Sequence, residues 1–434
     1  MEIKLGAITL GCDKNRVDTE KILKRAEEAG VTLVENVEDA DVVVVNTCAF
    51  IESAKRESID VILETAGLKK SNLKKLIVTG CFSKRYKDVM SEEFPEVDAV
   101  LGIDAPDKIV DVLKEFFDLS GNVCYDEKRV LTTPPHYAYL KISDGCDNHC
   151  TYCAIPYIRG RLHSTPMESL IKEAQLLYED GVKELIIVAQ DTTVYGKDIY
   201  GKPCLTELLR KICEIPFHTV RLLYAYPEGI SDELINFIAE NEKMAKYLDV
   251  PLQHISDRVL KRMARRTDEE QIRTLLSKLK NAGITVRSSF IVGFPGETDA
   301  DFEKLKEFIA EGMVDYAGFF EYSKEENTPA YRMDGHLPKV VKRKRRIEVE
   351  KIESRVVEKN HSEYLGKTVE LVFEGIDERK GRFYARLKEQ CPSVDPYVYV
   401  RADFPIEEGQ YYIAKIVKSG FYMEAVIEGE ADNE

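Results

Sequence analysis

The chain has 434 residues, of which 44% are apolar and 32% are charged. This composition supplies both buried faces and a solvated exterior, so it excludes wholesale disorder, and the length predicts two or three domains. The 77 acidic residues outnumber the 62 basic ones, and the net charge of −15 opposes a general attraction to nucleic-acid phosphates and favours a basic partner.

The first twelve residues alternate polar and apolar positions, and Lys4, Gly6 and Thr9 interrupt the apolar core that a signal peptide would need. No apolar run approaches the ~18 residues that cross a bilayer. We therefore expect a cytoplasmic protein with no membrane partner. The ten cysteines should stay reduced in that compartment, which leaves metal ligation or simple burial as their expected roles.

The N-terminal part of the chain alternates short β-branched runs with helix-like patterns. The predicted strands cover residues 3–10, 41–46, 75–79 and 97–101, and one predicted helix covers residues 16–29, where Gly30 ends it. Strands that alternate with helices pair in parallel, so residues 1–118 are predicted to form a doubly wound α/β sheet.

The central part begins after an extended connector, because Pro134 and Pro135 each disfavour helix in the preceding residue. Helical patterns, including residues 166–179 and 268–281, then separate six strand-like runs. The runs cover residues 137–143, 184–190, 219–225, 247–253, 284–293 and 316–323. Six βα units fall short of the eight in a full TIM barrel, so residues 132–362 are predicted to form a partial (βα)6 TIM-like barrel.

The C-terminal part changes pattern twice. A strongly basic run at residues 339–346 (KVVKRKRR) opens a helix-like segment, and either a solvated helix face or a binding patch would explain it. From Gly366 onward there are only short strands, at residues 368–373, 382–387, 397–401, 411–417 and 421–427. Residues 364–430 are therefore predicted to form a small all-β barrel.

Three cysteines, Cys146, Cys150 and Cys153, form a C-x3-C-x2-C pattern just after the first strand of the predicted partial barrel. Catalytic groups of βα barrels gather at the carboxyl ends of their strands. A structural zinc site would need a fourth ligand, and the only nearby candidate, His149, is adjacent to Cys150, where joint ligation is sterically awkward. Three thiolates on a [4Fe-4S] cluster would instead leave one iron open for a reactant.

In the segment SDGCDNHCTYCAIP the chain resembles the radical S-adenosylmethionine (SAM) superfamily, whose C-x3-C-x-aromatic-C signature it matches. The resemblance implies that the open iron chelates SAM and that one electron cleaves SAM to a 5′-deoxyadenosyl radical. It also implies which residues contact SAM: Tyr152 in the motif, Gln190 and Asp191 after the second strand, and Arg287, Gly293 and Gly296 on the fifth strand and its following loop. A tight strand-to-helix turn would explain the two glycines equally well.

A second set of cysteines, Cys12, Cys48 and Cys81, follows three predicted strands of the N-terminal sheet. The carboxyl ends of parallel strands share one edge, where open α/β sheets bind ligands, so cysteines 36 and 33 residues apart can converge. Burial as a core thiol would explain each of them singly. The other cysteines lack such a pattern and are expected to be structural: Cys124, Cys204, Cys213 and Cys391.

This arrangement of the second set resembles the N-terminal domain of the methylthiotransferase family, and the final barrel, beginning at YLGK (364–367), resembles the OB-like TRAM domain of that family. The resemblance implies that Cys12, Cys48 and Cys81 bind a second [4Fe-4S] cluster that supplies or relays sulfur. It implies two uses of SAM, because one molecule methylates cluster sulfur and the other yields the radical that removes a substrate hydrogen. The substrate radical then captures the methylthio group, and an electron donor such as flavodoxin or ferredoxin is needed. No side chain is clearly an acid or a base, so none is assigned as catalytic.

Two substrate classes fit this chemistry: an adenosine of transfer RNA and a residue of a ribosomal protein. Residues 141–156, 188–196 and 225–229 resemble the ribosomal-protein branch more closely, although Asp13 and Thr165 replace its common proline and arginine. That branch methylthiolates the β-carbon of an aspartate in small-subunit ribosomal protein twelve.

The charge of the final barrel bears on the same choice. From Gly366 onward it has 9 basic and 14 acidic residues, a net charge of −5, which suits a basic protein better than RNA, although an acidic barrel with a purely structural role would look the same. Methylthiolation of a transfer RNA adenosine stays the alternative. A radical enzyme with only the first cluster and a non-enzymatic electron carrier are the rival functions.

Overall fold

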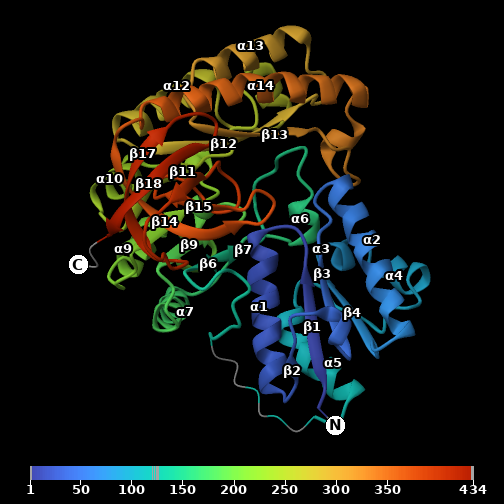
Figure 1. The fold of residues 1–434 in the computed structure, drawn as a ribbon. Helices are drawn as coiled ribbons and strands as arrows, with labels where there is room; N and C mark the ends of the chain where they lie inside the picture. Colours follow the sequence, from blue (N-terminus) through green and yellow to red (C-terminus); the bar gives the residue numbers. More distant parts are fainter. Residues whose placement is uncertain (1, 120, 122, 124–126, 432–434) are drawn as a thin grey trace.

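The computed structural model describes residues 2–119, 121, 123 and 127–431. Two parallel sheets and one closed barrel follow one another along the chain (Figure 1). Cys124, which was expected to be structural, lies outside the described residues. Within the described part, no helix combines the length and apolar character that a membrane span requires.

The N-terminal sheet is parallel and has the strand order β2-β1-β3-β4-β5. Its strands are β1 (Lys4–Thr9), β2 (Thr32–Leu33), β3 (Val42–Thr47), β4 (Lys75–Gly80) and β5 (Ala99–Val100). The central strand β3 is a run of four valines because both of its faces are covered: Val42 and Val44 pack into one apolar cluster, and Val43 and Val45 pack into another.

Helices cover both faces of this sheet, as a doubly wound arrangement requires (Figure 1). One face is packed against α1 (Asp13–Glu28) and α5 (Ala105–Phe116), and the other against α2 (Glu52–Gly67), α3 (Cys81–Arg85) and α4 (Lys87–Glu93). The short 3-10 helices are η1 (Val37–Asp39) and η2 (Leu68–Lys70). The two-residue strand β2 was not predicted, because two residues are too few to show a periodic pattern.

The central sheet is open and parallel, and its strand order β6-β9-β10-β11-β12-β13 follows the chain. Its strands are β6 (Tyr137–Lys141), β9 (Glu184–Val188), β10 (Thr219–Leu222), β11 (Met244–Asp249), β12 (Thr285–Val292) and β13 (Tyr316–Glu321). The six predicted strands are all present. β11 ends earlier than the predicted run at residues 247–253, because Pro251 has no N–H to continue the ladder. A two-stranded antiparallel pair, β7 (Ser143–Asp144) with β8 (His163–Ser164), follows β6.

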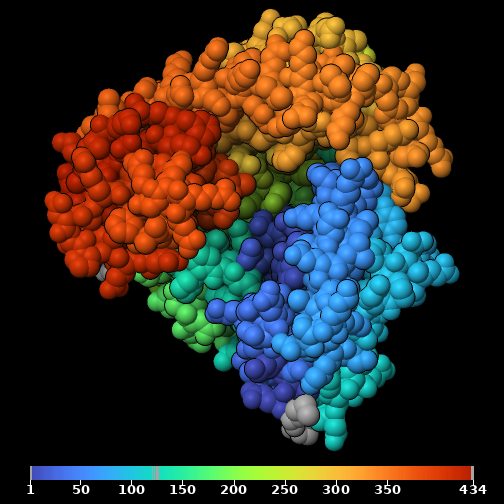
Figure 2. Space-filling model, turned by 45° about the vertical axis from the view of Figure 1, so that its right-hand side comes forward, coloured from blue at the N-terminus to red at the C-terminus, as the bar shows by residue number. Residues whose placement is uncertain are grey.

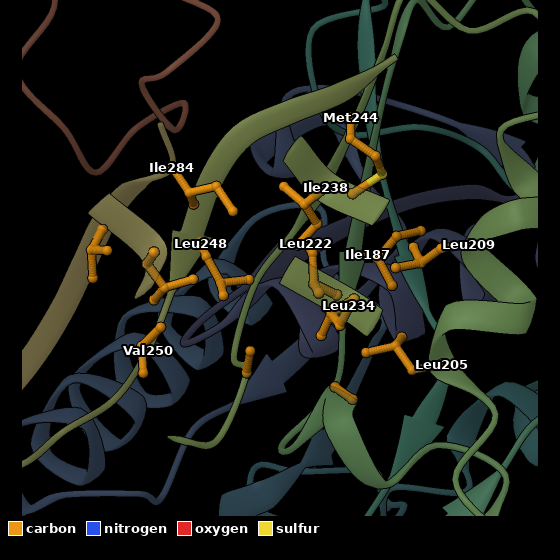
Figure 3. Close-up of a cluster of buried hydrophobic side chains, with 14 of the residues drawn as sticks. Ile187, Leu205, Leu209, Leu222, Leu234, Ile238, Met244, Leu248, Val250 and Ile284 are labelled. Atoms are coloured by element: carbon orange, nitrogen blue, oxygen red, sulfur yellow. The ribbon is translucent and has the colours of Figure 1, made fainter. Parts of the chain in front are cut away.

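Helices lie between and after these strands, and their apolar faces pack on the sheet (Figure 3). Leu222 and Leu248 from the strands pack with Leu209 from α9 and Ile238 from α10 in one large cluster. The helices are α6 (Ile155–Ile158), α7 (Met167–Glu179), α8 (Lys197–Tyr200), α9 (Leu205–Ile212), α10 (Asp232–Glu240), α11 (Asp257–Arg262), α12 (Glu269–Asn281), α13 (Asp299–Ala310) and α14 (Lys339–Ser362), with the 3-10 helices η3 (Thr192–Val194), η4 (Pro227–Gly229) and η5 (Pro329–Arg332).

The basic run at residues 339–346 forms the first part of α14 and only partly faces solvent. Lys342 Nζ donates to the Tyr322 carbonyl at 2.7 Å, and the buried Arg345 guanidinium pairs with Glu297 at 2.5 Å and with Asp299 at 2.6 Å. Part of the run therefore attaches the helix to the central sheet.

The predicted C-terminal barrel is confirmed as a closed five-stranded barrel with the order β14-β15-β16-β18-β17. Its strands are β14 (Thr368–Asp377), β15 (Arg382–Leu387), β16 (Val398–Arg401), β17 (Tyr411–Lys418) and β18 (Met423–Glu430). The barrel contacts the central strands: Glu184 at the start of β9 is ion-paired with Arg386, and Arg221 Nη2 of β10 donates to the Lys388 carbonyl at 2.8 Å. This contact leaves the carboxyl edge of the central sheet to other groups.

Candidate functional site

The three cysteines of the N-terminal sheet lie just beyond three neighbouring strands, at the carboxyl edge. Cys12 caps the amino end of α1 after β1, Cys48 follows β3, and Cys81 begins α3 directly after β4. The strand order reverses direction between β1 and β3, and such switch points are where open α/β sheets bind ligands. A Cβ on Gly11 would lie 2.8 Å from Cβ and 2.9 Å from Sγ of Cys48, so the chain entering Cys12 touches Cys48.

The buried side chain of Asn15 holds this edge together. Its Nδ2 donates to the carbonyl of Leu10 at 2.9 Å and to the carbonyl of Thr47 at 3.0 Å, which are the chain segments before Cys12 and Cys48. Its Oδ1 lies 3.8 Å from Sγ of Cys81. One amide therefore contacts the surroundings of all three cysteines, which we call the N-terminal trio.

Cys146, Cys150 and Cys153, the motif trio, lie on one loop after β7. Backbone hydrogen bonds shape the loop: Cys153 N donates to Cys150 O at 3.1 Å, and Cys146 N donates to Gly160 O at 3.1 Å. Asn148 N also points at the Cys146 sulfur, at 3.4 Å. Cys146 and Cys150 are buried, and Cys153 is partly exposed.

Two further side chains reach the Cys150 sulfur from outside the loop. Tyr226, which lies just after β10, places its hydroxyl 3.5 Å from Cys150 Sγ, and Arg265 donates to the same sulfur at 3.9 Å. The Arg265 guanidinium also stacks over the Tyr226 ring, 4.3 Å from its centroid. A thiolate at position 150 would thus have a cation and a hydroxyl donor beside it.

Burial makes the thiols weak acids in the absence of a metal. It raises the pKa of Cys48 to about 12 and that of Cys146 to about 11, and neighbouring thiols of the same trio add to both shifts. Burial also raises the pKa of Cys81, although the Arg159 guanidinium opposes that shift. Positive charge bound at each trio is therefore needed to keep the sulfurs as thiolates, and iron supplies such charge.

The donor sets fit iron–sulfur clusters. All nine described cysteines are free thiols, and within the described residues no group of three His, Cys, Asp or Glu is placed around a single ion. A [4Fe-4S] cluster makes a different demand, because each thiolate binds a separate iron and the sulfurs need not converge on one point. Each trio offers three sulfurs from adjoining segments. Cys204, Cys213 and Cys391 are buried free thiols outside both trios.

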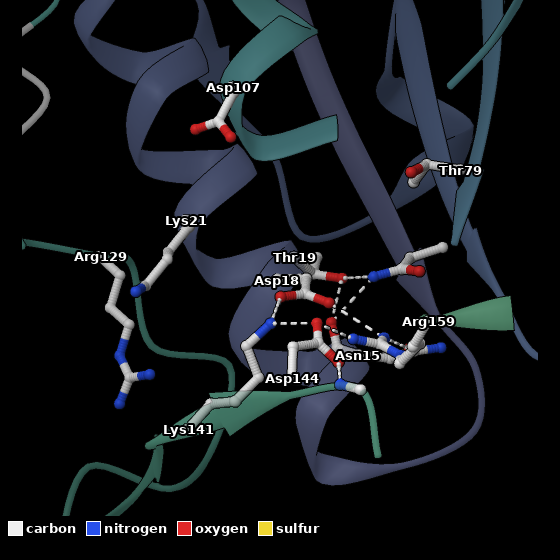
Figure 4. A network of polar contacts seen from close by, with 12 residues as sticks. Asn15, Asp18, Thr19, Lys21, Thr79, Asp107, Arg129, Lys141, Asp144 and Arg159 are labelled. Carbon is white, nitrogen blue, oxygen red and sulfur yellow. Dashed lines mark hydrogen bonds and ion pairs between the residues drawn. The ribbon is translucent and has the colours of Figure 1, made fainter. Parts of the chain in front are cut away.

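A buried ionic network connects the two trios (Figure 4). Arg159, six residues after Cys153, bonds to Asp144 at 2.5 Å, to Asp18 of α1 at 3.1 Å and to Asn15 Oδ1 at 2.6 Å. Lys141 at the end of β6 pairs with Asp18 and, at 3.2 Å, with Asp144. The network therefore ties the helix that starts at Cys12 to the loop that carries the motif trio.

The charges of this network compensate one another. Burial alone would raise the pKa of the Asp144 carboxyl, but the Lys141 ammonium and the Arg159 guanidinium hold it below its usual range. Asp144 stays ionised, so each carboxylate of the network is balanced by a cation. Removing one member would leave a buried charge without a partner.

Three of the six predicted SAM contacts lie at the motif loop. Tyr152 is within it, Gln190 Nε2 donates to Asp144 Oδ1 at 2.8 Å, and Asp191 Oδ2 accepts from Asn148 Nδ2 at 2.7 Å. Asn148 and Asp191 also line a pocket of about 500 Å³ beside the loop. The structure thus brings these three residues together with the motif cysteines.

The other three predicted contacts have different neighbours. Arg287 lies near the start of β12, where its guanidinium pairs with Asp395 of the C-terminal barrel at 2.7 Å. A Cβ on Gly293 would lie 2.2 Å from the Lys342 side chain, and one on Gly296 would lie 3.0 Å from Arg262 Nε. Both glycines have positive φ angles, as a tight turn requires. SAM binding at these three positions stays a prediction.

Several residues that shape the site were not predicted from the sequence: Asn15, Asp18, Asp144, Arg159, Tyr226 and Arg265. Asn15 and Asp18 lie within an ordinary helical pattern, and Asp144 and Arg159 flank the motif with no recognisable spacing of their own. Their proximity to the cysteines could have suggested a role, but only the contacts between the sheets identify their partners.

Comparisons with known proteins agree along the whole chain. Residues 4–102 match the model of the uncharacterized protein family UPF0004, and residues 140–309 match that of the radical SAM superfamily. The chain is 44% identical over 441 residues to the ribosomal protein uS12 methylthiotransferase RimO of Acetivibrio thermocellus, with 97% of both proteins covered. It is 43% identical to the protein of the same name from Thermoanaerobacter sp., with 96% of this chain and 98% of that protein covered.

Among solved structures, the radical SAM methyltransferase TsrM of Kitasatospora setae has a similar fold. It covers 73% of this chain and 72% of its own, with a TM-score of 0.54 and 14% sequence identity. At that identity the likeness concerns the fold alone.

Proposed function

This chain belongs to the RimO family of ribosomal protein uS12 methylthiotransferases, and from that membership we propose that it attaches a methylthio group to the β-carbon of an aspartate in uS12 by radical SAM chemistry. The observation that carries the proposal is the 44% identity over 97% of the chain, which spans both cysteine trios. Two cysteine trios in one chain would serve a reaction that has one radical centre and one sulfur centre.

We assign the motif trio as ligands of the cluster that binds SAM, and the N-terminal trio as ligands of an auxiliary cluster. When bound, the two [4Fe-4S] clusters and SAM supply the electron, the radical and the sulfur of the reaction. Three cysteines at each cluster leave one iron without a protein ligand, which gives each reactant a place to bind. We keep as proposed SAM contacts Tyr152, Gln190, Asp191, Arg287, Gly293 and Gly296, of which the first three are favoured by their place at the motif loop.

The chain's own residues would hold these parts in register and exclude water. Asn15 fixes the segments that carry Cys12 and Cys48, and Gln190 and Asn148 fix the motif loop. Arg159 holds the two trios at one separation, since it pairs both with Asp18 of α1 and with Asp144, which precedes the motif loop. A radical intermediate must not meet solvent, and burial of most of the six cysteines serves that need.

The architecture and partners that go with this function are proposed together. We assign residues 1–118 to the methylthiotransferase N-terminal domain, 132–362 to a radical SAM core with a partial (βα)6 TIM-like barrel, and 364–430 to an OB-like TRAM domain. The six-stranded order of the central sheet and the closed C-terminal barrel support the assignment. An electron donor such as flavodoxin or ferredoxin and a cytoplasmic location, where ribosomes are assembled, complete it.

The proposal is tested by an anaerobic assay that offers purified uS12 and unmodified transfer RNA side by side to the reconstituted protein, with both products read by mass spectrometry. We expect a methylthio gain on one aspartate of uS12. A gain on the RNA alone would overturn the choice of substrate.

Iron analysis of the same preparation tests the assignment of the clusters. About eight iron atoms per chain are expected from two clusters. About four would remove the auxiliary cluster and, with it, the proposed source of sulfur.

A further inference from the structure

Lys14 is a buried lysine whose ammonium forms no ion pair with any described carboxylate. Only 6% of its surface is exposed. Every other buried Lys or Arg in the described part of the chain has a carboxylate oxygen within 3.6 Å. Those side chains are Lys55, Arg129, Arg159, Arg221, Arg265, Arg345 and Arg386. A cation held in a largely buried position with no carboxylate at ion-pair distance is unfavourable, so its occurrence at one position points to a ligand from outside the chain.

The position of Lys14 is where the two sheets meet. It lies in the first turn of α1, two residues after Cys12, and its Nζ is 3.4 Å from the centroid of the Tyr224 ring. Tyr224 lies after β10 of the central sheet, two residues before Tyr226, whose hydroxyl contacts Cys150. The ammonium is thus flanked by Cys12 of the N-terminal trio on one side and by the segment that carries Tyr224 and Tyr226 on the other.

The contacts around Lys14 hold its ammonium in place without an ion pair, although its charge acts on Asp249 and opposes the effect of burial, which raises the pKa of that carboxyl. An aromatic face attracts a cation through its quadrupole but carries no net charge. The two nearby carboxylates are bonded to Tyr224 rather than to Lys14: Asp13 accepts from the Tyr224 hydroxyl at 3.2 Å, and Asp249 accepts from the Tyr224 backbone N–H at 3.3 Å. The tyrosine backbone there has φ 56°, a left-handed conformation that non-glycine residues rarely adopt.

We propose that Lys14 is a carboxylate-recognition site that binds the side chain of the substrate aspartate. This inference rests on the proposed function, because the β-carbon that reacts must lie between the two trios, and the carboxylate carbon is bonded directly to that β-carbon. A carboxylate buried there needs a cation, and the Lys14 ammonium forms no ion pair with a described carboxylate. Lys141 and Arg159, the other cations that join α1 to the motif loop, are already neutralised by Asp18 and Asp144.

The surface of the molecule offers a way to this region. Figure 2 shows a recess bordered by the blue N-terminal sheet, the red C-terminal barrel and the orange segment that contains α14, with green residues of the central part at its floor. A loop of a protein substrate inserted there would approach the place where the two sheets meet. The acidic C-terminal barrel at its rim suits a basic ribosomal protein.

The test measures binding of two peptides to the anaerobically reconstituted holoenzyme. One peptide contains the uS12 aspartate that is modified, and the other has asparagine at that position. We expect the wild type to prefer the aspartate peptide by about tenfold or more, the usual effect of one charged hydrogen bond. In Lys14→Met the preference should disappear, and in Lys14→Arg most of it should remain.

A matched control lies on the same helix. Lys24→Met makes the same substitution at a lysine that pairs with Glu27 and Glu28 on the surface, and it should keep the full preference. Binding of SAM should be unchanged in Lys14→Met, since the proposed ligand is the substrate and not the cofactor.

Three results would overturn the inference: equal binding of both peptides by the wild type, an unchanged preference in Lys14→Met, or a loss of SAM binding in Lys14→Met without loss of the peptide preference. The first needs no variant, so it decides the matter even if Lys14→Met fails to fold. Failure of the proposed function is distinguishable, because the wild type would then bind neither peptide and leave uS12 unmodified.

Discussion

The two parallel sheets of this protein each present three cysteines at a carboxyl edge, but they gather them in different ways. The motif trio lies within the eight residues from Cys146 to Cys153, on one loop. The N-terminal trio comes from three loops, with spacings of 36 and 33 residues. The first arrangement is a property of a short segment, whereas the second exists only when β1, β3 and β4 pair in register.

This difference determines what holds each trio. Backbone bonds hold the motif loop, both within it, from Cys153 N to Cys150 O, and to another segment, from Thr151 N to Met263 O. The N-terminal trio depends on a side chain, Asn15, that bridges separate loops. A binding site made from distant segments therefore depends on more of the fold than a site made from one loop. The ligands and the supporting side chains of each trio can be removed one at a time by substitution.

The largest effect is expected from removing one ligand of each trio. Cys150→Ala and Cys48→Ala should each lower the iron content from about eight to about four atoms per chain, because each affects one cluster. Both variants should lose methylthiolation of uS12, but only Cys150→Ala should lose reductive cleavage of SAM. Iron analysis and product chromatography check this. If either single variant lost all of its iron, the two sites would not be independent.

The next effect concerns the network that joins the sheets. Arg159→Met leaves the buried carboxylates of Asp18 and Asp144 with one cation fewer, so the free energy of unfolding should fall by about 3–5 kcal/mol. Chemical denaturation under anaerobic conditions measures it. Arg159→Lys should recover part of the loss, and the surface variant Arg210→Met, whose pair with Glu233 is exposed, should change stability by less than about 1 kcal/mol. Equal stability of Arg159→Met and wild type would contradict a structural role for the network.

A smaller effect should distinguish the N-terminal trio from the motif trio by how fast each loses iron. Asn15→Ala leaves the carbonyls of Leu10 and Thr47 without their donor, at a cost of about 2–3 kcal/mol. It should speed the loss of iron from the N-terminal trio only, as seen by following iron release to a chelator.

The matched variant at the motif trio is Asn148→Ala, which removes a single side-chain hydrogen bond to Asp191. It should retain iron better than Asn15→Ala, since the motif loop keeps its backbone bonds. Faster loss of iron from Asn148→Ala than from Asn15→Ala would show that the motif trio is the more fragile one.

The smallest effect is a difference in acid sensitivity. All seven histidines lie at or after His136, so the N-terminal sheet contains none. Burial lowers the pKa of His254, a fully buried residue that follows strand β11 of the central sheet, to about 3. As the pH falls below 6.5, the His254 imidazole is protonated in the unfolded chain but not in the folded one. The contribution of neutral His254 to stability is therefore fully present above pH 6.5 and decreases toward pH 3.

Between pH 6.5 and pH 5, the titration of His254 alone should lower the free energy of unfolding of the central sheet by about 1–2 kcal/mol. Hydrogen exchange at the two pH values, resolved by peptide, should show the loss in the central sheet and a smaller one in the N-terminal sheet. His254→Gln should flatten the pH dependence whatever its effect at pH 7. A steeper loss in the N-terminal sheet would be inconsistent with this account.

Much of the fold could be predicted from the sequence because its signals are local. The run of valines from Val42 to Val45 indicates a strand buried on both faces, and the five short strands after Gly366 indicate a barrel. Errors occurred where a pattern was too short or was cut by one residue, as with the two-residue β2 and with β11, which ends before Pro251. The ion pair of Arg287 with Asp395, a residue 108 positions away, follows from no sequence pattern, and the expected contact of Arg287 with SAM stays a prediction.

The sequence by itself determined the identity and spacing of the two cysteine sets, because strand ends and a C-x3-C-x2-C loop follow from periodicity and covalent geometry over a few residues. Only the tertiary structure decided which charges meet: that Arg159 pairs with Asp18, that Asn15 bridges two loops, and that Lys14 forms no ion pair with a described carboxylate. The physical reason is that ion pairs and hydrogen bonds act over a few ångströms of space, whatever the separation along the chain, so they leave no periodic trace in the sequence.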